Sequence, residues 1–316
     1  MNVQGDVMGD VKLFRISDSS VTELIGRSVA VEKTLQTMIE QNLDPLLGIR
    51  FLSSEYKTGS VHGGRIDTLG IDENNSPVII EYKRALNENV INQGLYYLDW
   101  LLDHRAEFEQ LVTKKLGGDA ALSLDWSGTR LLCIAGDFKK YDEYAVRQIN
   151  RNIELIRYKR FGEDLLFLDL VNAVRSDSSW QPGGWASEGI KIAHVAPATK
   201  TVETKLAAAS IEMRDRFDAI KDYCLSFGED VQVKMLKHYV AFSRIKNFAC
   251  VEIKPQDGDI VMYLRIDPET IQIENGFTRD MRSIGHMGTG DLEVIVKDEM
   301  DWERAKPLLA RAYEAA

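Results

Sequence analysis

The chain has 316 residues, of which 39 are Lys or Arg and 49 are Asp or Glu, so its formal net charge at pH 7 is −10. At roughly 150 residues per domain, this length predicts two domains. Hydrophobic residues make up 44% of the chain and charged residues 28%, a balance that is typical of a globular protein and excludes wholesale disorder. The acidic charge argues against a generally basic nucleic-acid-binding domain, although a local basic groove can still bind.

Three features of the sequence indicate a cytoplasmic protein without a membrane partner. The first ten residues contain no apolar core of a secretory signal. No apolar run approaches the roughly 18 residues of a membrane span. The cysteines, Cys133, Cys224 and Cys250, are few and far apart, which argues against a disulfide framework or a zinc knuckle.

Residues 1–174 are predicted to form an α/β domain, a mixed sheet flanked by helices. In chain order, the periodicities predict a strand at 11–16, a helix at 31–43, strands at 65–71 and 78–82, a helix at 89–116, a strand at 130–135, a helix at 141–150, and strands at 153–158 and 165–171. A dense turn signal at 72–77 joins two of these strands into a hairpin.

Residues 175–206 are predicted to be a linker, because their periodicity is poor and Pro and Gly recur. Residues 207–316 are predicted to form an α+β accessory domain that selects substrate or dimerises. Its expected elements are helices at 210–226 and 231–239, strands at 249–253, 260–266 and 292–296, and a closing helix at 301–313.

Two acidic residues on the predicted hairpin are the sharpest feature of the chain. Thirteen residues separate Asp67 from Glu81, and Lys83 projects from the same strand face as Glu81. A hairpin centred near Asn74 places the two acids opposite each other, with Cβ atoms about 4.5–5.5 Å apart. Carboxylates this close repel each other unless a cation neutralises them. Oxygen ligands suit Mg²⁺ or Mn²⁺, and Lys83 could then orient a water or stabilise charge on a phosphate.

Asp67, Glu81 and Lys83 resemble the core motif of the PD-(D/E)XK nuclease superfamily. The runs 63–67 and 79–83 are similar to those of mismatch- and flap-type DNA endonucleases in that superfamily. The residue before Asp67 is Ile66 rather than proline. An acidic hairpin can also be no more than a solvated edge, but here an apolar run precedes Glu81, which is unusual for a surface strand.

Two flanking helices add to the resemblance. The helix before the core carries Glu32, with Glu40 as the alternative, where the superfamily often supplies a further acid. The helix after the core carries Gln93 and Tyr97, which match the Q-x-x-x-Y pattern and lie on one helix face. The resemblance therefore implies a restriction-endonuclease-like core that hydrolyses phosphodiester bonds with Mg²⁺ or Mn²⁺.

The resemblance also implies roles for single residues. Asp67, Glu81 and the main-chain carbonyl of Tyr82 would hold the metal, Glu32 would bind it directly or through water, and Lys83 would assist the attacking water. Gln93 and Tyr97 would position the nucleic-acid backbone or the waters of the metal. Contacts with phosphates are expected from three further side chains, Arg65, Arg84 and His62.

Two stretches outside this motif each allow two interpretations. The basic stretch of Arg157, Lys159 and Arg160 could contact phosphates or form a solvated face. The glycine-rich loop 285–290 matches neither the dinucleotide fingerprint nor the P-loop, so it serves tight turns or a ligand. Residues 282–294 and 303–308 resemble an uncharacterised bacterial domain that is sometimes labelled "predicted transport protein", a label that the absence of a membrane span contradicts.

The sequence as a whole predicts a Mg²⁺-dependent DNA endonuclease in DNA repair or in defence against foreign DNA. The alternatives are a catalytically silent nuclease fold that binds or scaffolds, and a nuclease that acts on RNA. Cleavage of both strands would favour a symmetric homodimer.

Overall fold

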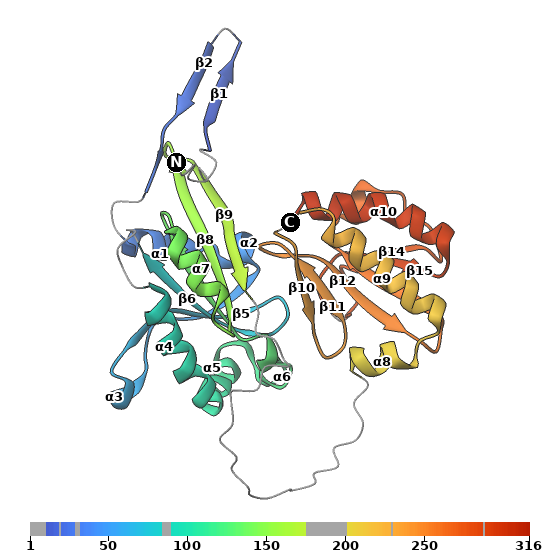
Figure 1. Ribbon diagram of the computed structural model, residues 1–316, viewed down its shortest axis with the longest axis horizontal. Coiled ribbons are helices and arrows are strands. Elements are labelled where there is room, and N and C mark those ends of the chain that lie inside the picture. Colours follow the sequence, from blue (N-terminus) through green and yellow to red (C-terminus); the bar gives the residue numbers. More distant parts are fainter. Residues whose placement is uncertain are drawn as a thin grey trace, which may run out of the picture.

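The computed structural model describes residues 11–18, 20–28, 32–83, 90–174, 201–228, 230–286 and 288–316. Within these ranges the chain is a mixed α/β protein built around two large sheets, one before residue 175 and one after residue 200 (Figure 1). Arg84 and residues 175–200 of the expected linker lie outside the described residues. No described helix has the length and apolar character that crossing a membrane requires.

The first large sheet has seven strands in the order β3-β8-β7-β6-β5-β4, and β9 pairs with β8. Strands β6, β7 and β8 are parallel, whereas the other pairs are antiparallel. The strand bounds are β3 Gly26–Arg27, β4 Ile49–Lys57, β5 Arg65–Asp72, β6 Pro77–Lys83, β7 Arg130–Ala135, β8 Asn152–Phe161 and β9 Leu165–Val174. A separate hairpin of β1 (Leu13–Ser17) and β2 (Ser20–Leu24) projects beyond one end of this sheet (Figure 1).

Helices cover both faces of this sheet because alternate residues of its central strands are apolar on both sides. Ile79 packs in one core with α4 and α5, whereas its neighbours Val78 and Ile80 pack in another with α1 and α2. The helix bounds are α1 Glu32–Glu40, α2 Leu43–Leu47, α3 Gly59–His62, α4 Val90–Asp103, α5 Arg105–Leu116, α6 Gly118–Leu122 and α7 Lys140–Arg147, with a 3₁₀ turn at Trp126–Gly128.

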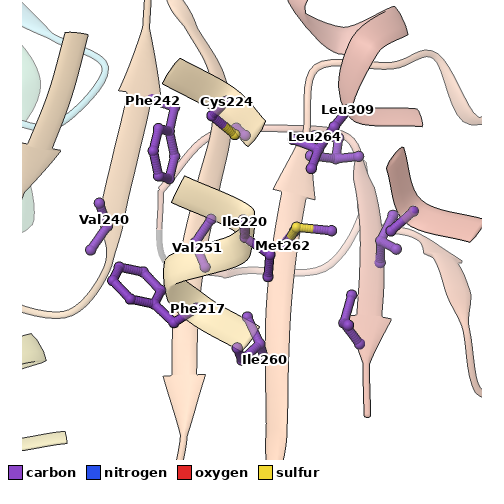
Figure 2. Packing of buried hydrophobic residues seen from close by; sticks show 14 of the residues in the cluster. Phe217, Ile220, Cys224, Val240, Phe242, Val251, Ile260, Met262, Leu264 and Leu309 are labelled. Atoms are coloured by element: carbon purple, nitrogen blue, oxygen red, sulfur yellow. The ribbon is translucent and has the colours of Figure 1, made fainter. Parts of the chain in front are cut away.

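The second large sheet is antiparallel, with the order β10-β11-β12-β13-β15-β14. Figure 2 shows how Phe217, Ile220 and Cys224 of α9 pack onto apolar residues of its strands. The bounds are α8 Val202–Ala208, α9 Ile211–Leu225, β10 Gln232–Met235, β11 Val240–Ser243, β12 Asn247–Lys254, β13 Asp259–Leu264, a 3₁₀ turn Pro268–Thr270, β14 Thr278–Asp280, β15 Leu292–Val296 and α10 Glu299–Glu314.

Some predicted elements differ from the structure. The helix expected at 89–116 is two helices, because the chain turns at His104, whose ring stacks on Trp100. The helix expected at 231–239 is wrong: residues 232–235 form β10, which pairs with β11. Strand β4 was not predicted, and α8 begins at Val202, inside the range expected for the linker.

The turn between β5 and β6 joins the two parts of the protein. Asn74, at the tip, is buried, and its Oδ1 accepts hydrogen bonds from Tyr239 (3.0 Å) and Asn247 (2.8 Å). Next to it, Glu73 forms an ion pair with Arg265 and accepts the main-chain N–H of Asn247 at 2.8 Å. The hairpin predicted to carry the catalytic acids is therefore fixed at its turn by the C-terminal part.

Candidate active site

Asp67 and Glu81 lie side by side at the end of the hairpin remote from the turn. The register pairs Thr68 with Ile80 and so brings the two acids opposite each other, as the spacing predicted. The main-chain N–H of Asp67 donates to Glu81 Oε1 at 3.1 Å, and the main-chain N–H of Tyr82 donates to Asp67 Oδ2 at 3.1 Å. Glu81 is fully buried, and its Oε2 has no hydrogen-bond partner among the described residues.

Burial makes the negative charge of this pair costly. Desolvation, together with the neighbouring Asp67, raises the pKa of Glu81 to about 9. The pKa of Asp67 is also raised, mainly by desolvation, and the hydrogen bond from Tyr82 and the charge of Lys83 oppose this shift. Without a cation, the pair therefore holds a proton at neutral pH, and a bound cation would displace it.

Lys83 projects from the end of β6 toward the first residue of α1. Its Nζ lies 3.3 Å from Glu32 Oε1, and 14% of the Lys83 side chain is exposed. Glu40, the alternative acid, lies at the other end of α1, about two turns beyond Glu32, and accepts from Thr68 Oγ1 at 2.5 Å. Of the two helix acids, Glu32 is thus the one that contacts Lys83.

Two side chains that the sequence analysis did not single out belong to this site. Gln36 is buried between Glu32 and Glu40 on α1, and its amide donates to the carbonyl of Asp67 at 2.8 Å. Its spacing of four residues from Glu32 is the signal that could have identified it.

Glu55 is the second additional side chain of this site, and only the structure identifies it. It lies on β4 between the paired positions that flank Asp67, with a left-handed φ of 55°. It forms ion pairs with Lys33 (2.7 Å) and with Arg65, which lower its pKa. Non-glycine residues rarely adopt this backbone conformation, and such strain is concentrated at functional sites.

Gln93 and Tyr97 connect α4 to the start of β5. Gln93 Nε2 lies 3.4 Å from the Tyr97 hydroxyl, which accepts the main-chain N–H of Arg65 at 3.1 Å. Tyr97 is buried, so in this conformation it positions the strand that carries Asp67 rather than facing nucleic acid. His62, the last residue of α3, lies against the exposed ring of Tyr96.

The basic residues of β8 divide into two groups. Arg157 is mostly buried and forms ion pairs with Asp137 (3.4 Å) and Asp169, so its charge is already neutralised. Lys159 and Arg160 lie further along β8, beyond the last residue that pairs with β7. Because Lys83, Ala135 and Arg157 share one row of the sheet, this extension of β8 borders the edge where Lys83 lies.

The oxygen atoms at this site fit a hard divalent cation. Two carboxylates are adjacent, one oxygen of Glu81 is buried without a partner from the described segments, and the main-chain carbonyl of Tyr82 belongs to the same strand as Glu81. No group of three or more His, Cys, Asp or Glu side chains in metal-binding arrangement occurs in the described part of the chain. Asp67, Glu81 and the Tyr82 carbonyl would therefore have to be completed by waters or substrate, as is usual for Mg²⁺.

Comparisons with known proteins identify relatives without assigning a function. Residues 202–316 match a protein family described as "Domain of unknown function (DUF5655)". The chain is 26% identical over 313 residues to an uncharacterized protein of Haemophilus influenzae, in a match that covers 96% of this chain and all of the relative. No solved structure matches the chain.

Proposed function

We propose that the protein is a Mg²⁺-dependent (or Mn²⁺-dependent) endonuclease of the PD-(D/E)XK type with DNA as its substrate. The observation that carries this proposal is the buried Asp67–Glu81 pair, with Lys83 on the same strand as Glu81, whose Oε2 has no partner in the part of the chain that the structure describes. Unpaired buried carboxylate oxygens are destabilising. A buried carboxylate pair with such an oxygen is therefore expected where a cation or substrate completes the site.

The arrangement of the sheet supports the same proposal. A restriction-endonuclease-like core needs an antiparallel hairpin that continues into a parallel strand and a helix that delivers a further acid. Here β5 and β6 are antiparallel, β6 and β7 are parallel, and α1 brings Glu32 to Lys83.

In this proposal each residue has a separate task. Asp67 and Glu81 hold the cation, which when bound would polarise the phosphate and lower the pKa of a water. Lys83 orients the attacking water and stabilises negative charge on the phosphate. Glu32 keeps the ammonium group of Lys83 in place. Gln36 donates to the main-chain carbonyl of Asp67 and Tyr97 accepts the main-chain N–H of Arg65, so both fix the geometry of β5.

Basic and aromatic side chains around this edge provide a surface for the DNA backbone. Lys159 and Arg160 extend beyond the parallel strands. Helix α7, which follows β7, exposes Tyr144 between Lys140 and Arg147, whose charged groups lie 6.0 and 5.6 Å from its ring. These basic side chains would contact the DNA backbone despite the net charge of −10, and binding should weaken steeply as the salt concentration rises.

A cleavage assay tests the proposal. The full chain is incubated with linear, circular, single-stranded, branched and mismatched DNA and with RNA, in Mg²⁺, Mn²⁺ or EDTA. We expect metal-dependent cleavage of DNA that is lost in Asp67→Asn and in Lys83→Ala. Binding without cleavage of any substrate would instead support a silent binding fold, and selective cleavage of RNA would contradict the choice of DNA.

A further inference from the structure

A cleft between the two parts of the protein has no role in the proposed hydrolysis. It has a volume of about 360 Å³ and lies between the β5–β6 turn with residues 122–125 on one side and, on the other, residues 236–239 with the glycine-rich loop. Pockets of this size can enclose a small organic ligand. The cleft is remote from Asp67 and Glu81, which occupy the other end of the hairpin.

The acidic and amide side chains of the cleft are already engaged within the protein. Glu73 is paired with Arg265, Asn74 with Tyr239 and Asn247, and Asn75 accepts from Arg50 at 2.6 Å. Asp125 Oδ1 accepts the main-chain N–H of Ser127 at 2.9 Å. These groups define the walls of the cleft, and a ligand would have to find its polar partners elsewhere.

The basic side chains of the cleft are not engaged in this way. His286 stacks on Tyr263, and its Nδ1 lies 3.0 Å from the carbonyl of Ile284. A carbonyl only accepts, so Nδ1 donates and Nε2 of the neutral ring carries a lone pair. That Nε2 atom is buried and has no hydrogen-bond partner in the described part of the chain.

Lys237 and His238, on the opposite rim, have no side-chain partner among the described residues. Lys237 is exposed, and His238 is half-buried. Burial lowers the pKa of His238, and Lys237 and Lys205 lower it further, whereas Glu252 and Asp125 act in the opposite direction. An anion bound here would reverse this shift, because it would favour the protonated imidazole.

We propose that this cleft binds a small phosphate ester of nucleotide size, held by Lys237, His238 and His286. Lys237 and protonated His238 donate to the phosphate oxygens, and the ring of His286, stacked on Tyr263, forms part of the wall against the organic part. The ligand would contact both parts of the protein at the turn of the β5–β6 hairpin. This site does not depend on the proposed nuclease activity.

Calorimetric titration of the full chain tests this site. The probes are AMP, GMP and ribose 5-phosphate, with adenosine and inorganic phosphate for comparison, at pH 7 and pH 8, where a phosphate monoester is largely dianionic. We expect one or more of the esters to bind, at least tenfold more tightly than adenosine or inorganic phosphate. Affinity should increase severalfold from pH 8 to pH 7 because His238 takes up a proton, and His238→Gln should remove this change.

Three variants complete the test. Lys237→Ala should weaken binding at least tenfold, whereas His286→Phe, which keeps a ring against Tyr263, should retain most of the affinity. Lys254→Ala, which removes a lysine at the end of β12 and outside the cleft, should leave affinity unchanged. The proposal is overturned if no ester binds, if inorganic phosphate binds equally well, or if Lys237→Ala retains wild-type affinity.

Discussion

The two ends of the β5–β6 hairpin bury polar groups in opposite ways. At the turn, Glu73 and Asn74 are matched by partners from the C-terminal part. At the other end, Asp67 and Glu81 are adjacent, their pKa values are raised, and Glu81 Oε2 has no partner among the residues that the structure describes. Groups that are matched stabilise the fold, whereas an unmatched pair costs free energy. Substitutions at the two ends should therefore have opposite effects on stability and activity.

The largest effect should come from Asp67→Asn, which keeps the shape of the side chain and removes its charge. We expect the single-turnover rate of DNA cleavage to fall at least about 100-fold, the order typical of losing one electrostatic contributor at an active site. Asp103→Asn, at an exposed position in α4, is the matched control. If the Asp67→Asn variant were as active as the control, the catalytic residues would have to lie elsewhere in the protein.

Metal binding should stabilise the folded chain through the same end of the hairpin. Mg²⁺ or Mn²⁺ at 100 times its Kd is expected to add about 2.7 kcal/mol to the free energy of unfolding, because it binds the folded state. Denaturation in the presence of metal or EDTA measures this difference. Glu81→Gln should abolish it, and a stabilisation that persists in Glu81→Gln would show that the metal binds at another site.

At the turn, Asn74→Ala should destabilise the protein by about 2 kcal/mol, because it leaves the buried Tyr239 hydroxyl without its acceptor and removes one of the acceptors of the Asn247 amide. Urea denaturation measures this loss. In a double-mutant cycle with Tyr239→Phe, the two losses should not add. Additive losses would mean that the hydrogen bond contributes little to the junction.

The pH dependence of stability in EDTA should report on the acidic end of the hairpin, which holds Glu81. An unfolded glutamate releases its proton near pH 4.5, whereas folded Glu81 keeps it until about pH 9. Between these values the folded state binds more protons, so its stability falls as pH rises, by at most about 1.4 kcal/mol per pH unit from this group. Asp67, whose pKa is also raised, acts in the same direction.

Glu81→Gln provides the reference for this measurement. The variant does not titrate at this position, so its free energy of unfolding should exceed that of the wild type by an amount that grows from pH 5 to pH 9. A constant difference across this range would mean that Glu81 is ionised in the folded protein throughout.

The smallest effect separates the two acids of α1. Glu40→Ala, which removes the acceptor of Thr68, should cost about 1 kcal/mol of stability, the usual value of a hydrogen bond, with little change in cleavage. Glu32→Gln should reduce cleavage and leave stability nearly unchanged, because the pair with Lys83 is partly exposed. The reverse pattern would identify Glu40 as the functional acid.

The sequence was sufficient to predict the hairpin because all of its determinants are local. The turn residues and the spacing of Asp67 and Glu81 together define the register, and the structure confirms that the two acids lie opposite each other. The catalytic roles of these residues stay a prediction. Glu55 could not be found in this way, because its place beside Asp67 depends on an irregular β4 strand that pairs across the sheet.

The incorrect helix at residues 231–239 illustrates the same limit. Its Lys, Met and Leu residues favour a helix locally, but pairing with β11 overrides this preference. The contacts that join the two parts could not be predicted from the sequence either, since Asn74 and Asn247 are separated by 173 residues. No pattern within a short window can predict such a contact.

The buried junction at Asn74 has a consequence for how such a chain can evolve. A C-terminal module that lacked the counterparts of Tyr239, Asn247 and Arg265 would leave polar groups of the hairpin unmatched in the interior. Recombination that exchanges one half for an unrelated domain is thereby disfavoured, and the halves are expected to be inherited as a unit. The Haemophilus influenzae relative, which matches along its entire length, carries both.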